Sequence, residues 1–189
     1  MPWSQNPITT FTFFRKGWRE KRVWIYAGDY DKIPTNGGKT GADTPPYTIE
    51  VSGRSMELIQ NNSAGGTHTV LTCKYEGFAR HKALIRSNHG ITSTERNGLF
   101  SSGWKFVYMS TQYKWSVPVF SSIWILCDTS NKEIARFHRN SFRFRRIGKL
   151  EIYSQQLHGT IDPDFVAMIM VTCKLVHNTV KNNERSASS

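Results

Sequence analysis

The chain has 189 residues, which suits one domain that buries its core without disulfides or metals. Its 38% hydrophobic and 13% aromatic content exclude disorder of the whole chain. The 25 basic and 14 acidic residues give a net charge of +11, which predicts attraction to nucleic acid or an anionic membrane, or serves only solubility. We expect neither a signal peptide nor a transmembrane segment.

The three cysteines, Cys73, Cys127 and Cys173, are widely spaced along the chain. Their number is odd and their spacing fits neither a disulfide framework nor a metal motif. We therefore expect a reduced, cytoplasmic setting, with Cys127 and Cys173 as unreactive core thiols.

Most of the chain alternates between apolar and polar residues, which is typical of half-buried β-strands. Turn-forming residues separate these segments, for example at 61–66 and 128–132. In chain order, the predicted strands are 47–51, 68–75, 80–86, 104–115 (turning back near 110–112), 123–127, 133–139, 142–145 and 149–153.

The remaining segments divide into loops and tails. Three glycines and the Pro45-Pro46 pair predict an exposed loop over 32–46. Residues 1–7 are expected to form an N-terminal tail, and the polar residues 179–189 a disordered C-terminal tail. Residues 8–178 then form one domain.

Residues 162–176 break the β pattern. Either Asp162 or Thr160 can cap a helix, and Pro163 suits its first position. The following residues are apolar on nearly every side, which predicts a buried helix too short to cross a bilayer. The alternative is a final buried strand. The residues expected to form the core of this helix are Phe165, Met168, Ile169, Met170 and Leu175.

Several segments between residues 99 and 176 share motifs with a known group of proteins. They are 103–105 with 112–115, the hairpin formed by 124–128 and 131–137, the strand 149–152, and the closing segment 162–176. In this order and spacing they resemble the fungal tubby C-terminal-like family, which is related in fold to tubby domains, phospholipid scramblases and LURP-one-related proteins.

This resemblance implies an all-β fold with one buried helix. The expected architecture is a closed antiparallel β-barrel of about 12 strands around the apolar C-terminal helix. The physics agrees, because a barrel of this size has a lumen too wide for its own side chains to fill.

The sequence lacks the constellations typical of enzymes. The six histidines show no zinc-ligand spacing, and neither a nucleophile elbow nor a phosphate-binding loop is present. Residues 37–40, Gly-Gly-Lys-Thr, are interpreted as a flexible loop. We therefore predict no catalysis, no metal and no cofactor.

Basic residues gather in rows that predict an anion-binding surface, although each row is also consistent with a solvated strand face. The first row contains Arg136, Arg139, Arg143, Arg145, Arg146 and Lys149. The second contains Arg80 and Lys82, with Lys74 and Arg86 nearby. The third contains Arg15, Lys16, Arg19, Lys21 and Arg22, flanked by Trp18 and Trp24.

Tubby domains bind phosphoinositide headgroups, so the resemblance implies a non-enzymatic reader of anionic membrane lipids. Such a protein would be cytoplasmic and peripheral at the inner face of the plasma membrane. Arg80-x-Lys82 and Arg143-x-Arg145 have the spacing of the tubby lipid pair, without an aligned context. The alternatives are a nucleic-acid-binding protein that uses basic and aromatic residues, and a protein-interaction domain with no specific anion ligand.

Overall fold

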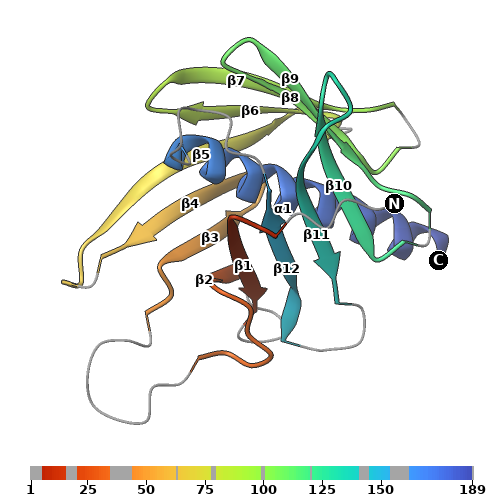
Figure 1. Ribbon diagram of the computed structural model, residues 1–189. Coiled ribbons are helices and arrows are strands. Elements are labelled where there is room, and N and C mark those ends of the chain that lie inside the picture. The colour runs from red at the N-terminus through yellow and green to blue at the C-terminus, as the bar shows by residue number, and fades with distance from the viewer. Residues whose placement is uncertain are drawn as a thin grey trace.

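The computed structural model describes residues 6–15, 21–34, 44–62, 64–77, 80–98, 101–119, 121–140, 145–153 and 162–188. In these ranges the chain forms twelve β-strands and one α-helix. The strands close into an antiparallel barrel around the helix (Figure 1). The predicted fold class is therefore confirmed.

Each strand pairs with its neighbours in the sequence, and β1 closes the ring by pairing with both β2 and β12. The strands are β1 (Thr9–Phe14), β2 (Arg22–Ala27), β3 (Tyr47–Ser52), β4 (Ser55–Asn61), β5 (Thr67–Glu76), β6 (Lys82–Ser87), β7 (Gly90–Arg96), β8 (Trp104–Tyr108), β9 (Thr111–Ser116), β10 (Ile123–Asp128), β11 (Glu133–Arg139) and β12 (Arg146–Ile152).

The helix α1 (Pro163–Ala187) runs through the barrel from one mouth to the other (Figure 1). At its start, the Tyr108 hydroxyl at the end of β8 donates a hydrogen bond to Asp162. Near its end, Asn183 donates to the Ser102 hydroxyl just before β8. We call these two openings the N-terminal mouth and the C-terminal mouth.

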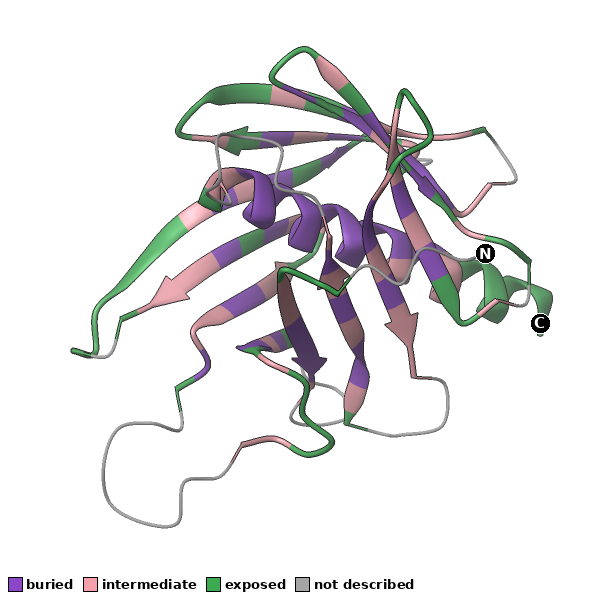
Figure 2. Cartoon of the chain, viewed as in Figure 1, coloured by how far each residue is buried: buried purple, intermediate pink, exposed green. Residues whose placement is uncertain are grey.

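Alternation along the strands divides the lumen from the outer surface. In β8, Trp104, Phe106 and Tyr108 are buried, whereas Lys105 and Val107 point outward. The same pattern recurs around the barrel, so the buried residues line its inside (Figure 2). This inner wall and the helix together form one hydrophobic core, because a strand sends successive side chains to opposite faces.

The helix fills the lumen, as the sequence predicted. Asp162 caps it by accepting a hydrogen bond from the Asp164 amide, and Pro163 occupies its first turn. Every residue from Phe165 to Val176 is buried, including all five predicted core residues. A helix buried on every side needs apolar residues on every side. The alternative of a final strand is therefore wrong.

The helix continues beyond its predicted end at 176, and residues 179–187, expected to be a disordered tail, are helical. Two contacts hold these polar turns at the C-terminal mouth. Thr179 accepts a hydrogen bond from the Trp104 indole at 2.9 Å, and Glu184 binds Arg139. The polar composition of residues 179–187, which predicted a disordered tail, is that of a largely exposed helical segment.

Other expectations differ in detail. Strands β1, β2, β4 and β7 were not predicted, and β12 is one strand where a break was expected near Gly148. Gly148 instead allows β11 to approach closely, because a Cβ there would collide with the Phe137 ring and the His138 carbonyl. Three segments covered by these predictions lie outside the described residues: residues 1–5, the glycine-rich part of the 32–46 loop, and residues 142–144.

Candidate functional site

The structure brings together part of the first predicted basic row. Arg136 on β11 and Lys149 on β12 point outward from neighbouring strands, and Arg146 begins β12 beside them. Arg143 lies outside the described residues. Arg145 is exposed, and its carbonyl accepts a hydrogen bond from the Arg15 amide.

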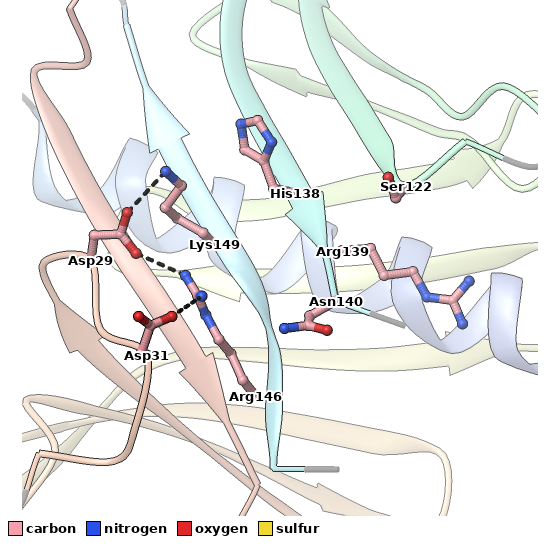
Figure 3. A pocket seen from close by; sticks show the side chains of 8 residues that line it. All are labelled: Asp29, Asp31, Ser122, His138, Arg139, Asn140, Arg146 and Lys149. Atoms are coloured by element: carbon pink, nitrogen blue, oxygen red, sulfur yellow. Dashed lines mark hydrogen bonds and ion pairs between the residues drawn. The ribbon is translucent and has the colours of Figure 1, made fainter. Parts of the chain in front are cut away.

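Two aspartates from the segment after β2 reach these basic residues (Figure 3). Arg146 donates hydrogen bonds to Asp29 at 2.7 Å and to Asp31 at 3.0 Å. Lys149 lies 3.0 Å from Asp29 and 2.8 Å from Glu151. Carboxylates therefore already bind the two terminal nitrogens of Arg146 and the ammonium of Lys149, whereas the buried Arg146 Nε has no hydrogen-bond partner among the described residues.

The Thr12 side chain holds the aspartate segment in this position by hydrogen bonds to its backbone. The buried Thr12 hydroxyl donates to the Gly28 carbonyl at 2.6 Å and accepts from the Tyr30 amide at 3.1 Å. Gly28 has a φ of 118°, which side-chain-bearing residues rarely adopt. The chain thus folds back across the outside of β1 and carries Asp29 to β12.

Glu151 is the centre of a second group of contacts on the same surface. It contacts His138 at 2.8 Å and Tyr153 at 2.6 Å, in addition to Lys149. Burial opposes its ionisation, but these three hydrogen-bond partners prevail and lower the pKa of Glu151 to about 2. Arg136 binds Glu133 at 2.9 Å, and its guanidinium lies over the Tyr153 ring.

A cleft of about 650 Å³ opens over this surface (Figure 3). Its lining residues are Asp29, Asp31, Ser122, His138, Arg139, Asn140, Arg146 and Lys149. We call the outer side of β11 and β12, with the aspartate segment, the paired face. It carries three basic residues (Arg136, Arg146, Lys149) against four acidic ones (Asp29, Asp31, Glu133, Glu151), so it has no excess positive charge.

Arg139 belongs to a different environment. It follows Phe137 by two residues and therefore shares the inward direction of that side chain. Its guanidinium binds Glu184 on the helix at 2.7 Å and points away from Arg146 (Figure 3). The sequence alone placed Arg139 with its neighbours because it gave no sign of the carboxylate on the helix.

The second predicted row is also divided. Lys82 points outward from β6, but Arg80 precedes the strand with a φ of 52° and turns its guanidinium over the buried Tyr75 ring. In the third row, Arg22 binds Glu50 at 2.9 Å. Residues 16–20 lie outside the described residues.

The outer side of β5–β9 carries the clearest excess of positive charge on a strand surface. Its outward basic side chains are Lys74, Lys82, Arg86, Lys105 and Lys114, and its outward acidic side chains are Glu76 and Glu95. We call these five basic residues the basic face. Sequence reasoning missed Lys105 and Lys114, although both alternate with buried aromatic residues.

Glu95 engages only part of the basic face. It lies 2.7 Å from Lys105 and 3.9 Å from Lys82. Lys74, Arg86 and Lys114 form no ion pair with the residues that the structure describes. Lys105 and Lys114 stand directly opposite each other in the β8–β9 pair, an arrangement of like charges that is unfavourable without a counter-ion.

A further group of cations surrounds the C-terminal half of the helix. Lys174 is only 9% exposed, and its ammonium lies 3.4 Å from His177 Nδ1. Burial, then the charges of Lys181 and Arg15, lower the pKa of Lys174 to about 8. Burial and the neighbouring cations likewise depress the pKa of His177.

Other chemistry is sparse in the described part of the chain. The three cysteines are free thiols, and burial raises the pKa of Cys73 to about 12. Among the described residues, His, Cys, Asp and Glu form no cluster of three or more suited to a metal ion. The described part of the chain contains no helix that is long and apolar enough to cross a bilayer.

Comparison with known proteins identifies the fold. No protein-family model and no curated protein matches the chain. The crystal structure of an Arabidopsis thaliana protein, AT5G01750, is similar with a TM-score of 0.55 and 9% sequence identity, covering 94% of each chain. At this identity the similarity is one of fold, and the chain shares the barrel around a C-terminal helix that the tubby-like resemblance implied.

Proposed function

We propose that this protein is a non-enzymatic module that binds anionic phospholipid headgroups at a membrane surface through its basic face. The observation that carries the proposal is the opposition of Lys105 and Lys114, with Lys74, Lys82 and Arg86 on adjacent strands. Glu95 is a counter-ion for Lys105 only, so a headgroup phosphate between the two ammonium groups would supply one for Lys114, which forms no ion pair with the described residues.

Exposed apolar side chains adjoin the basic face. Ile91 on β7, Val107 on β8 and Met109 in the β8–β9 turn are 60%, 46% and 56% exposed. The β6–β7 and β8–β9 hairpins, which carry these side chains, project at the N-terminal mouth (Figure 1). Apolar side chains beside basic ones suit a surface that enters the interfacial layer while its cations contact headgroups.

The magnitude is sufficient for reversible attachment. Each basic residue near an anionic leaflet contributes about 1 kcal/mol, so the five residues contribute about 5 kcal/mol before the two glutamates are set against them. Attachment of this strength is peripheral and sensitive to salt. We infer the ligand from the tubby-like fold together with this peripheral attachment: a phosphoinositide at the inner face of the plasma membrane.

A pair of charge-reversal variants tests the assignment of the face. The first replaces Lys74, Arg86 and Lys114 with Glu, and the matched control replaces the exposed Lys21, Lys32 and Lys132 with Glu. Both change the net charge equally. In sedimentation with phosphatidylcholine vesicles containing phosphatidylserine, we expect the first variant to remain in the supernatant and the control to retain most binding. Equal loss in both would refute a localised lipid surface.

A further inference from the structure

The three tryptophans of the inner wall differ in one respect. The indole N–H of Trp104 donates to Thr179, and that of Trp115 donates to Thr172. The N–H of Trp124 is equally buried but has no hydrogen-bond partner among the described residues. A buried donor is normally satisfied, so Trp124 calls for a partner that the described chain does not supply.

Packing fixes the Trp124 indole in its position. Its ring stacks on Phe137 with the centroids 5.1 Å apart and the planes at 27°. His177 of the helix packs 6.3 Å from it on centroid distance. Because Trp124 is fully buried among these rings, rotation of the indole toward another acceptor would disrupt the core.

Trp124 lines a cleft of about 720 Å³ at the C-terminal mouth. This volume is within the range of small-molecule sites, about 300–1,000 Å³. The loop before β8, the β9–β10 connection and the last turns of α1 form its walls. The lining residues are Ser101, Ser102, Val117, Pro118, Val119, Ser121, Ser122, Trp124, Arg139, Val180, Asn183, Glu184 and Ala187.

The lining indicates the class of ligand. Its apolar side chains suit a hydrocarbon body, and its serines and Asn183 provide neutral polar groups. The two charged residues, Arg139 and Glu184, bind each other at 2.7 Å and so neutralise one another. A charged ligand would have to disrupt this pair, whereas an uncharged ligand would not.

We propose that this cleft binds an uncharged, mainly apolar small molecule whose oxygen displaces the groups that cover the buried Trp124 indole N–H and accepts a hydrogen bond from it. The site goes beyond membrane binding through the basic face, since it lies at the C-terminal mouth and uses none of the basic-face residues. Either proposal, the cleft or the membrane-binding face, can therefore fail without the other.

Indole N–H resonances of the ¹⁵N-labelled full-length protein test the proposal. The Trp124 resonance is the one lost in Trp124→Phe. Titration with 2-octanone, which carries an acceptor, is expected to move it downfield to saturation, as a new hydrogen bond requires. Octylammonium, which has donors but no acceptor, should not produce this shift. An unmoved Trp124 resonance, or equal shifts with both probes, would overturn the proposal.

A second variant locates the ligand and does not alter the core. Ala187 is exposed on the last helical turn and lines the cleft, so Ala187→Phe fills space there with little effect on folding. We expect this variant to weaken 2-octanone binding and to leave the unliganded Trp124 resonance near its original position. Unchanged affinity in Ala187→Phe would place the ligand outside the cleft and refute the assignment.

Discussion

Trp115 on β9 donates a hydrogen bond from its indole N–H to the hydroxyl of Thr172 on the helix over 3.0 Å. Both residues are fully buried, and the same hydroxyl donates to the Met168 carbonyl one turn earlier. This contact joins the barrel wall to the helix in a place where water cannot substitute for either partner. It therefore fixes the rotation of the helix within the lumen.

Replacing Thr172 with Val keeps the shape of the side chain and removes the acceptor. We expect the free energy of unfolding to fall by about 1–3 kcal/mol, because the Trp115 N–H is left buried and unpaired. Urea unfolding measures this change, and the exposed Thr67→Val is the matched control. If both variants unfolded at the same urea concentration as the parent, the contact would have no energetic role.

The interior position of Met168 gives a harsher test of the threaded helix. This residue is 1% exposed at the middle of the lumen, so Met168→Lys would bury a charge without a partner. We expect no soluble, cooperatively folded protein. The conservative Met168→Leu should fold with a loss below about 1.5 kcal/mol. Parent-like thermal melting of Met168→Lys would contradict the arrangement of helix and barrel.

The buried Lys174 opposes folding at neutral pH. Burial, then Lys181 and Arg15, lower its pKa to about 8 from the ordinary 10.5, so the folded state releases this proton more readily than the unfolded state. Its contribution to stability therefore rises as pH increases from about 8 to 10.5. We expect Lys174→Met to stabilise the protein by about 2 kcal/mol at pH 7.

Urea unfolding at pH 7 and pH 10 checks the sign of this effect. The gain from Lys174→Met should be largest at pH 7 and smaller at pH 10. The exposed Lys114→Met should change little at either pH. A destabilised Lys174→Met at pH 7 would show that the ammonium has a stabilising partner in the folded protein.

Glu151 makes the opposite contribution. Burial disfavours its charge, but Lys149, Tyr153 and His138 hold its pKa at about 2, below the ordinary 4.5. Its stabilising effect is present above the unfolded pKa and is lost as pH falls from about 5 to 2. We expect Glu151→Gln to lose about 2 kcal/mol at pH 7 and to show a weaker acid dependence. Thermal melting at several pH values measures this effect. If the melting temperatures of parent and variant changed in parallel with pH, this role would be contradicted.

The sequence predicted those features that depend on local patterns. Alternation of Trp104, Phe106 and Tyr108 with polar residues predicted an inward-facing strand, and the Asp162-Pro163 pair predicted the helix start. The apolar run after them predicted burial on every side. Each of these signals arises from neighbours in the chain, which is why they survive in the folded protein.

Features that depend on distant partners were not accessible. Asp29 and Arg146 are far apart in the sequence, and only closure of β1 onto β12 brings them together. Arg139 was placed in a surface row because the sequence does not reveal Glu184 beside it. Charge counts predicted where cations are numerous, but not which of them already have carboxylate partners.

The central claim is best tested by sedimentation of the full chain with vesicles. Phosphatidylcholine vesicles, alone or with phosphatidylinositol bisphosphate or phosphatidylserine at equal total charge, are compared in the presence and absence of a labelled single-stranded RNA. The account predicts no binding to neutral vesicles, binding to both anionic types, and a preference for the inositide that RNA does not abolish. Binding of RNA with no vesicle binding at all would contradict it.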